Sequence, residues 1–204
     1  MDSDTLWHHI DTERAALADI LAELPEDAWR TQSLCAEWTV RDVAAHLALS
    51  HLGLRDLLVA AVRSGFRYQA IVRDSALRCP LDHDEIVGRL RSFVGSRRTV
   101  PFVSEREPLL DVLVHTQDIC LPLDIEHPMP PDAAVVALER VLWWSRRMPI
   151  GPRLRDVRLV ATDVDWASGS GRRIAGPVQW LLLAAAGRAV AHDHLRGEVA
   201  ALAA

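Results

Sequence analysis

Three histidines in this chain each follow an acidic residue by four positions. The pairs are Asp4/His8, Asp42/His46 and Asp111/His115. Four residues turn an α-helix through about 400°, so both members of such a pair lie on one face of a helix. A carboxylate and an imidazole placed in this way can bind the same metal ion.

Two of the pairs also have ordinary structural interpretations. Asp4 and His8 lie at the N-terminus, where we expect both to be solvated. Asp42 stands three residues after Thr39, which is the spacing of a capping box, so it is expected to bond the Thr39 backbone amide. His46 lies near the apolar stripe of its segment, where it is either a hydrogen-bonded core histidine or a ligand.

The pair formed by Asp111 and His115 lies in an otherwise apolar segment, where a charged carboxylate needs a partner. His46 belongs to a different expected helix, and metal sites in helix bundles are built from facing side chains on different helices. Two histidines and one carboxylate are a usual catalytic zinc set that leaves a position for water or substrate. The sequence therefore predicts that His46, Asp111 and His115 bind one divalent metal ion, with zinc the first choice.

Helical periodicity of apolar residues indicates the elements that position these side chains. It extends over four segments without alternating strand patterns, at residues 6–24, 40–65, 82–93 and 105–121. Cap signals precede the last three, at Thr39–Asp42, Asp82–Glu85 and Ser104–Glu107. We therefore expect a mainly α fold in which residues 4–121 form an up-down four-helix bundle.

The C-terminal part of the chain changes in character. A fifth helix is expected from residue 131 to the proline-rich stop at 149–152. Residues 157–162 have a strand pattern, residues 172–174 are expected to pair back on them, and an apolar helix should cover 177–191. We expect a metal-binding helical-bundle domain over residues 1–150 and a small α/β domain over 151–204.

Residues 33–47, Ser-Leu-Cys-Ala-Glu-Trp-Thr-Val-Arg-Asp-Val-Ala-Ala-His-Leu, resemble a signature of the mycothiol-dependent maleylpyruvate isomerase family. Residues 111–119, Asp-Val-Leu-Val-His-Thr-Gln-Asp-Ile, resemble its second signature, an acid-x-x-x-His pair followed by Asp and an aliphatic residue. Residues 174–188 resemble part of its small C-terminal domain. The resemblance spans nearly the whole chain and implies a DinB-like metal-binding bundle with a short α/β C-terminal extension.

The resemblance also implies roles for single residues. His46 and His115 match the metal-ligand histidines of the family, and Asp111 stands where the family usually has the longer Glu. Arg188 matches a C-terminal arginine implicated in activity, and its alternative role is that of a cation at a helix C-terminus. The implied cosubstrate is mycothiol, which acts on a small-molecule electrophile.

These observations favour a metal-dependent enzyme that uses a low-molecular-weight thiol. Metal coordination lowers the pKa of a thiol, and the thiolate attacks an electrophile, which gives thiol transfer or cis–trans isomerisation. One alternative is a non-catalytic metal-binding sensor on the same bundle. Another is a DNA-binding regulator, because residues 39–50 superficially resemble the start of a helix-turn-helix, although Ala48 replaces the usual turn glycine and the helical pattern continues through it.

Composition limits the remaining possibilities. The chain has 23 arginines and no lysine against 28 acidic residues, and its net charge of −5 argues against a broad nucleic-acid-binding face. The absence of lysine excludes Schiff-base and P-loop lysine chemistry. Cys35, Cys79 and Cys120 do not form a disulfide framework. We expect a cytoplasmic monomer or small homo-oligomer without membrane association.

Several other residues could carry chemistry, and each has a plainer alternative. Cys35 is a nucleophile or a structural thiol. Asp118 either orients a metal-bound imidazole or is an exposed helix residue. The His192-Asp193-His194 run binds metal or is a solvated helix end, and the Trp143-Trp144 pair is expected to face the core on one side and an interface on the other.

Overall fold

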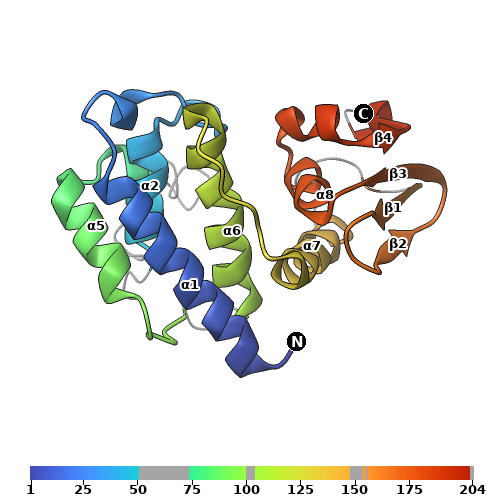
Figure 1. The fold of residues 1–204 in the computed structure, drawn as a ribbon, viewed down its shortest axis with the longest axis horizontal. Helices are drawn as coiled ribbons and strands as arrows, with labels where there is room; N and C mark the ends of the chain where they lie inside the picture. The colour runs from blue at the N-terminus through green and yellow to red at the C-terminus, as the bar shows by residue number, and fades with distance from the viewer. Residues whose placement is uncertain (51–73, 100–103, 148–153, 155, 203–204) are drawn as a thin grey trace. The chain divides into compact units, whose positions relative to one another are not determined.

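The computed structural model describes residues 1–50, 74–99, 104–147, 154 and 156–202. The chain forms two compact units, Ser3–His127 and Pro128–Ala204, and the second also includes the first two residues (Figure 1). The sequence pattern predicted a domain boundary after residue 150. The units divide earlier because helix α7 (Pro131–Ser145) packs against helix α8 (Val178–Ala185).

The first unit is a bundle of helices, as expected. Its described elements are α1 (Ser3–Ala22), η1 (Ala28–Arg30), α2 (Val40–Ala48), α5 (His83–Ser92), α6 (Arg106–Cys120) and η2 (Leu121–Leu123). Helix α1 packs beside α5 and α6, and α2 packs beside the same two helices. The mainly α fold predicted from the apolar periodicity is therefore confirmed.

Two of the three expected cap signals are capping boxes in the structure. The Asp42 carboxylate accepts from the Thr39 amide at 2.9 Å, and the corresponding bond at the start of α5 joins the Asp82 amide to Glu85. The expected box at Ser104 is absent. Its hydroxyl accepts from the amide of Arg106 at 3.2 Å, and α6 begins there without a side-chain cap bond at its N-cap residue.

Two helices end earlier than the apolar pattern predicted. Helix α2 ends at Ala48, where the Leu49 amide is shared among three preceding carbonyls, and the rest of the helix expected to residue 65 lies outside the described residues. Helix α8 ends at Ala185 rather than at residue 191, because Gly187 adopts φ 86° and the amide of Arg188 bonds back to the carbonyl of Leu183 at 2.9 Å. This is a Schellman C-terminus, for which glycine is the preferred residue.

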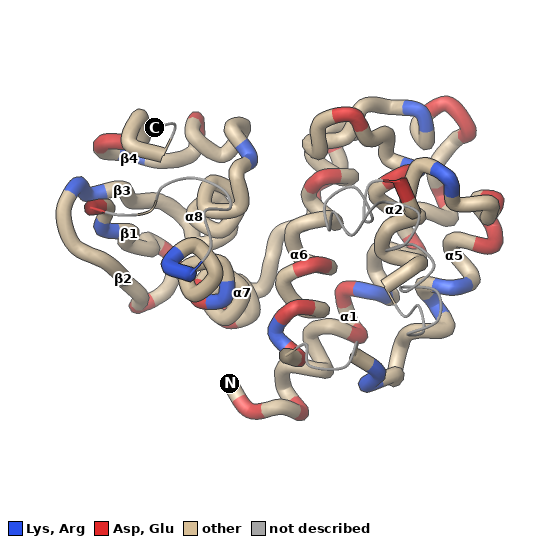
Figure 2. Tube along the Cα trace, turned by 180° about the vertical axis from the view of Figure 1, so that it is seen from behind, with Lys and Arg blue, Asp and Glu red and all other residues tan. Residues whose placement is uncertain are grey.

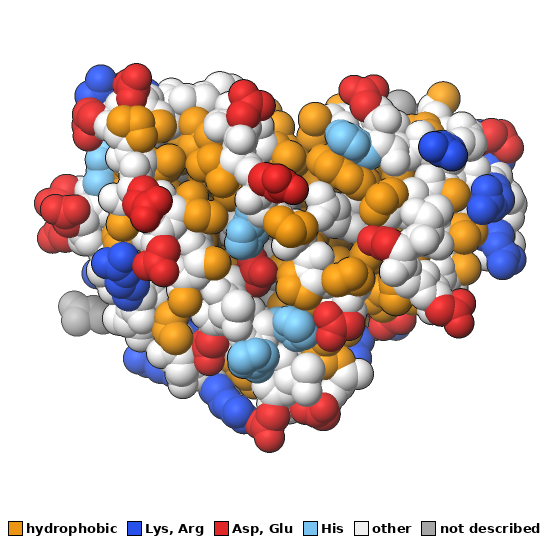
Figure 3. Space-filling view, in the orientation of Figure 1, with side chains coloured by type: hydrophobic (Ala, Val, Ile, Leu, Met, Phe, Trp, Pro, Cys, Tyr) orange, Lys and Arg blue, Asp and Glu red, His pale blue; other side chains and the backbone are white. Residues whose placement is uncertain are grey.

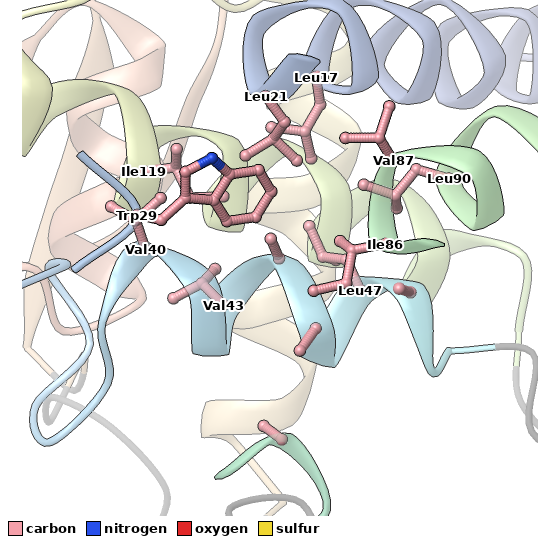
Figure 4. Packing of buried hydrophobic residues seen from close by; sticks show 14 of the residues in the cluster. Leu17, Leu21, Trp29, Val40, Val43, Leu47, Ile86, Val87, Leu90 and Ile119 are labelled. Atoms are coloured by element: carbon pink, nitrogen blue, oxygen red, sulfur yellow. The ribbon is translucent and has the colours of Figure 1, made fainter. Parts of the chain in front are cut away.

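An apolar core fixes the spacing of the bundle helices. Figure 4 shows buried side chains from four helices and the η1 turn converging on one another, with the Trp29 indole among them. The largest fully buried aliphatic side chains of this core are Leu17, Leu21, Ile86, Leu90 and Ile119. Full burial of one such side chain stabilises the fold by about 1.5–3 kcal/mol. The core therefore holds α2 at a defined distance from α6.

The second unit combines helices with a small sheet. Strands β1 (Val157–Ala161), β2 (Ala167–Gly169), β3 (Arg172–Gly176) and β4 (Arg196–Gly197) pair in the order β2-β1-β3-β4. The two expected strands do pair, but β1 and β3 run parallel, and β2 lies antiparallel on the other edge of β1. The short turns η3 (Ala189–His194) and η4 (Val199–Leu202) complete the unit. No helix in the described part of the chain is long and apolar enough to cross a membrane.

The connection between the two units is anchored on both sides. His127 Nε2 lies 2.9 Å from Glu13 Oε2 on α1, and its carbonyl accepts from the Gln117 side chain at 2.5 Å. Two residues later, the Met129 amide donates to the Gln179 side chain on α8 at 3.1 Å. A single proline separates these anchors along the chain.

Candidate metal centre

The loop formed by residues 31–39 leads into α2 and lies against α6. The Leu34 amide donates to the backbone carbonyl of Asp118 at 3.1 Å, which ties the loop to that helix. Within the loop, the Trp38 carbonyl accepts from the Ser33 hydroxyl at 2.7 Å and from the Gln32 amide group at 2.8 Å. The capping box at Thr39 then starts α2 in a fixed direction.

Three side chains from α2 and α6 face one another. Asp111 Oδ2 lies 3.5 Å from His46 Nε2, and its other oxygen lies 3.5 Å from His115 Nε2. The two imidazole rings meet edge to face with centroids 5.0 Å apart. All three ligand atoms lie within 4.8 Å of one another, so residues from two helices form one cluster.

The spacing of these atoms can be compared with that around a zinc ion. Ligand atoms at about 2.0–2.2 Å from a tetrahedral zinc are roughly 3.3–3.6 Å from one another. Both distances from the Asp111 carboxylate to the imidazole nitrogens are 3.5 Å. The donor set and its spacing therefore fit a divalent metal held by two nitrogens and a carboxylate.

Solvent reaches this cluster. The Asp111 side chain is 37% exposed, whereas those of His46 and His115 are 20% and 14% exposed. Figure 3 shows histidine side chains reaching the surface among acidic and apolar ones, so exposure by itself does not distinguish a site. The exposed carboxylate would leave room for a small molecule beside a bound metal.

Asp111 also determines the protonation of His46. Burial lowers the pKa of the His46 imidazole, but the charge of the Asp111 carboxylate and a hydrogen bond to it raise this pKa, and the net effect is a raised value. A metal ligand must be a neutral imidazole. A metal ion would therefore replace a proton between these two side chains.

The opposite nitrogen of His115 faces a different pair of side chains. Its Nδ1 lies 2.8 Å from Oδ2 of Asp118, and the Cys35 thiol donates to the same oxygen at 3.1 Å. These three residues form a second group whose ligand atoms lie close enough together to hold a metal ion. The two short distances are those of hydrogen bonds, however, and are smaller than the separations expected between ligands of one zinc ion.

A buried aromatic ring lies beside the cluster. The Trp38 ring centroid is 5.4 Å from that of His46 and 6.3 Å from that of His115, and Trp38 is 7% exposed. Sequence reasoning assigned no role to Trp38, although it lies within the first signature. Its ring packs beside both imidazoles.

The structure gives plainer roles to several other candidates. Asp4 accepts from Arg97 at 2.7 Å, and His194 stacks face to face on Trp180 at a centroid distance of 3.6 Å. Cys120 is buried, and desolvation raises the pKa of its thiol to about 12, which makes it a poor nucleophile.

Arg188 and the tryptophan pair lie in the second unit. The Arg188 guanidinium donates to the carbonyl of Ala186 at 2.6 Å, as expected of a cation at the end of a helix. The Trp143 ring is 37% exposed and is approached by the guanidinium carbons of Arg140 at 4.2 Å and Arg147 at 3.9 Å.

The chain also matches known proteins. A family model described as the mycothiol maleylpyruvate isomerase N-terminal domain matches residues 10–92, which include His46 but end before α6. Two similar solved structures are a crystal structure of the mycothiol-dependent maleylpyruvate isomerase and one of its histidine-to-alanine mutant. Their TM-scores are 0.59 and 0.61, both at 13% identity and covering 97% of this chain and 93% of theirs. No curated protein matches the sequence.

The fold and the matched segment define the class. This is a mainly helical protein with a small C-terminal sheet, and it shares its fold with those isomerase structures. Residues 10–92 match the mycothiol maleylpyruvate isomerase N-terminal domain, as the signature in residues 33–47 predicted.

Sequence reasoning could not find every contact at the site. The bond between Cys35 and Asp118 joins a loop to a helix far along the chain, and no regular spacing signals it. Asp118, expected either to orient a metal-bound imidazole or to be exposed, is buried and lies 2.8 Å from His115 on the same helix face.

Proposed function

We propose that this protein is a metal-dependent enzyme that activates a low-molecular-weight thiol, mycothiol, for cis–trans isomerisation or thiol transfer on a small electrophile. The observation that carries the proposal is the pair of 3.5 Å distances from Asp111 to His46 and His115. The match of residues 10–92 and the names of the similar solved structures support the choice of thiol and reaction.

The residues of the cluster have distinct parts in this proposal. His46 and His115 supply two neutral nitrogens, and Asp111 supplies a negative charge that compensates part of the charge of a divalent ion. Such an ion, when bound, lowers the pKa of a thiol so that it is a thiolate at neutral pH. Trp38 packs beside both imidazoles.

The isomerisation needs no reactant other than the thiolate and the substrate. The thiolate sulfur forms a bond to one carbon of a cis double bond conjugated to a carbonyl, and the displaced electron pair moves to the carbonyl oxygen. The former double bond is now single and rotates. Return of the electron pair expels the thiolate and restores the double bond in the trans form.

Arg188 is proposed to bind a carboxylate of the substrate or of the thiol adduct. A guanidinium can form two parallel hydrogen bonds with a carboxylate, which lysine cannot reproduce. In the structure Arg188 bonds to the carbonyl of Ala186, a contact that an anionic ligand could supplement or replace.

The test is turnover of electrophiles that carry a cis-enone and a carboxylate, measured with mycothiol present or omitted. Activity should require the thiol, disappear when a strong chelator removes the metal, and return when zinc is added. A chain that binds metal but turns over none of these substrates would be a metal-binding sensor. Turnover that is unaffected by metal removal would exclude the proposed role of the cluster.

A further inference from the structure

A buried carboxylate contacts His115 on the side away from Asp111. Asp118 is fully buried, and its Oδ2 lies 2.8 Å from His115 Nδ1. The ring of His115 is thus contacted by a carboxylate at each nitrogen, at 2.8 Å on one side and at 3.5 Å on the other. The shorter contact has hydrogen-bond length, and the longer one has the length expected between two ligands of one ion.

We propose that Asp118, fixed in place by Cys35 and the loop before α2, is the positioning residue that presents Nε2 of His115 to the metal. This inference rests on the proposed metal site and assigns a specific role to two residues beside it. A carboxylate can only accept a hydrogen bond, so His115 must carry its proton on Nδ1. The lone pair of the neutral ring is then on Nε2, which faces Asp111 and His46.

The helix makes this arrangement rigid. Asp111, His115 and Asp118 are spaced by four and three residues on α6, so all three side chains share one face. The ring of His115 is held between two positions of one helix and cannot turn without breaking the bond to Asp118. Outer carboxylates of this kind also raise the basicity of a metal-bound imidazole.

The loop before α2 holds Asp118 through two consecutive residues. The Leu34 amide donates to the backbone carbonyl of Asp118 at 3.1 Å, and the Cys35 thiol donates to its side chain at 3.1 Å. The thiol and the imidazole share the same carboxylate oxygen. Cys35 therefore restrains the rotation of the Asp118 carboxylate that orients His115.

The same geometry argues against Cys35 as a metal ligand. Its sulfur lies 3.8 Å from Nδ1 of His115, the nitrogen already bonded to Asp118. A metal bound between Cys35 and His115 would have to displace that hydrogen bond and use the nitrogen that faces away from His46. The thiol instead donates to a carboxylate that is already in place.

The first test measures zinc affinity by competition with a chromophoric chelator. Asp118→Asn keeps the size of the side chain but removes its charge, and we expect zinc binding to weaken by about 10–100-fold, as is typical for loss of such a partner. The control is Asp19→Asn, a 71% exposed carboxylate on α1 that pairs with Arg91 and should leave the affinity unchanged. Equal affinities of wild type and Asp118→Asn would overturn the inference.

The second test does not require metal. Nitrogen-15 NMR of the metal-free protein, at a pH where His115 is neutral, reports which ring nitrogen carries the proton. The expected result is protonation at Nδ1 in the wild type and a mixture of the two forms in Asp118→Ala. A wild-type ring protonated at Nε2 would overturn the role of Asp118. Failure of zinc to bind a wild type with the expected tautomer would instead overturn the proposed metal site, and Asp118 would then only orient the His115 ring.

Cys35 is tested by two substitutions and by cobalt. Cys35→Ser keeps a donor and should retain zinc affinity within about threefold, whereas Cys35→Ala should weaken it by less than Asp118→Asn does. Cobalt bound to the wild type should lack the intense near-ultraviolet band of thiolate ligation. A thiolate band that disappears in Cys35→Ser would show that Cys35 is a ligand and overturn its positioning role.

Discussion

His46 on α2 and Asp111 on α6 approach to 3.5 Å between Nε2 and Oδ2, although they belong to two helices that are far apart in the sequence. The contact depends on the packing of α2 beside α6 and on the Thr39 capping box that starts α2. It joins the two sequence signatures in space, and it raises the pKa of the His46 imidazole against the opposing effect of burial.

Asp111 should tolerate lengthening better than loss of charge. Asp111→Glu introduces the longer acid that the family resemblance implies at this position and should keep zinc binding, because the exposed side chain has room to adjust. Asp111→Asn removes the charge, and zinc affinity should fall at least tenfold. Loss of a residue that only contacts a ligand costs roughly 10–100-fold, and loss of a ligand's charge should cost no less. Chelator competition measures both, and an Asp111→Asn protein with wild-type affinity would contradict the assignment.

The two capping boxes allow the stability of α2 to be separated from its role at the site. Thr39→Ala and Asp82→Ala each remove a cap and should each lower the free energy of unfolding by about 1 kcal/mol. Only Thr39→Ala loosens the helix that carries His46, so only this variant should also weaken zinc binding. Urea unfolding and chelator competition on the same preparations measure the two effects. Equal losses of zinc affinity would show that the effect is a general one of stability.

The His127–Glu13 pair should make stability depend on pH. The hydrogen bond to Glu13 raises the pKa of His127, burial opposes this, and the charge of Glu13 adds to it. Because the folded pKa is above the unfolded value near 6.5, the contribution to stability is complete below about pH 6.5 and is lost as the pH rises through the folded pKa. The difference in Tm between wild type and His127→Gln should therefore be larger at about pH 5.5 than at about pH 9. A difference that grows with pH would be inconsistent with this pair.

Arg188 should affect substrate use and not metal content. Arg188→Ala and Arg188→Lys should both lower kcat/KM for carboxylate-bearing substrates by about tenfold or more, because neither can form the paired hydrogen bonds of a guanidinium. Zinc content should be unchanged in both. Arg188→Ala also loses the bond to Ala186, so Arg188→Lys is the variant less affected by altered stability. Full activity in both variants would contradict the proposed role of Arg188 in binding a carboxylate.

The local features of the fold could be predicted from the sequence because they depend on local spacing. The capping boxes at Thr39 and Asp82 and the shared helix face of Asp111 and His115 all follow from short-range patterns. The apolar pattern overestimated the length of α8, because it continues past Gly187 while the backbone does not. The apolar pattern also predicted a helix that continues through Ala48, which argued against a helix-turn-helix. That prediction is wrong, because α2 ends at Ala48.

Contacts between distant segments were harder to predict. The parallel pairing of β1 with β3 and the Cys35–Asp118 bond depend on how the chain packs, which no period in the sequence encodes.

The distribution of charge does not depend on these contacts. Acidic and basic residues are interspersed along the described helices (Figure 2), in keeping with the net charge of −5. A partner with a uniformly negative surface such as DNA remains unfavoured.

The measurement that tests the central claim most directly is the zinc stoichiometry and affinity of the wild type, His46→Ala and His8→Ala. His8 is the matched control because it also follows an acidic residue by four positions but is exposed on α1. The wild type and His8→Ala should bind one zinc per chain with equal affinity, and His46→Ala should bind at least tenfold more weakly because a ligand is lost. A wild-type chain without a zinc site, or an unchanged affinity in His46→Ala, would contradict a metal centre built from α2 and α6.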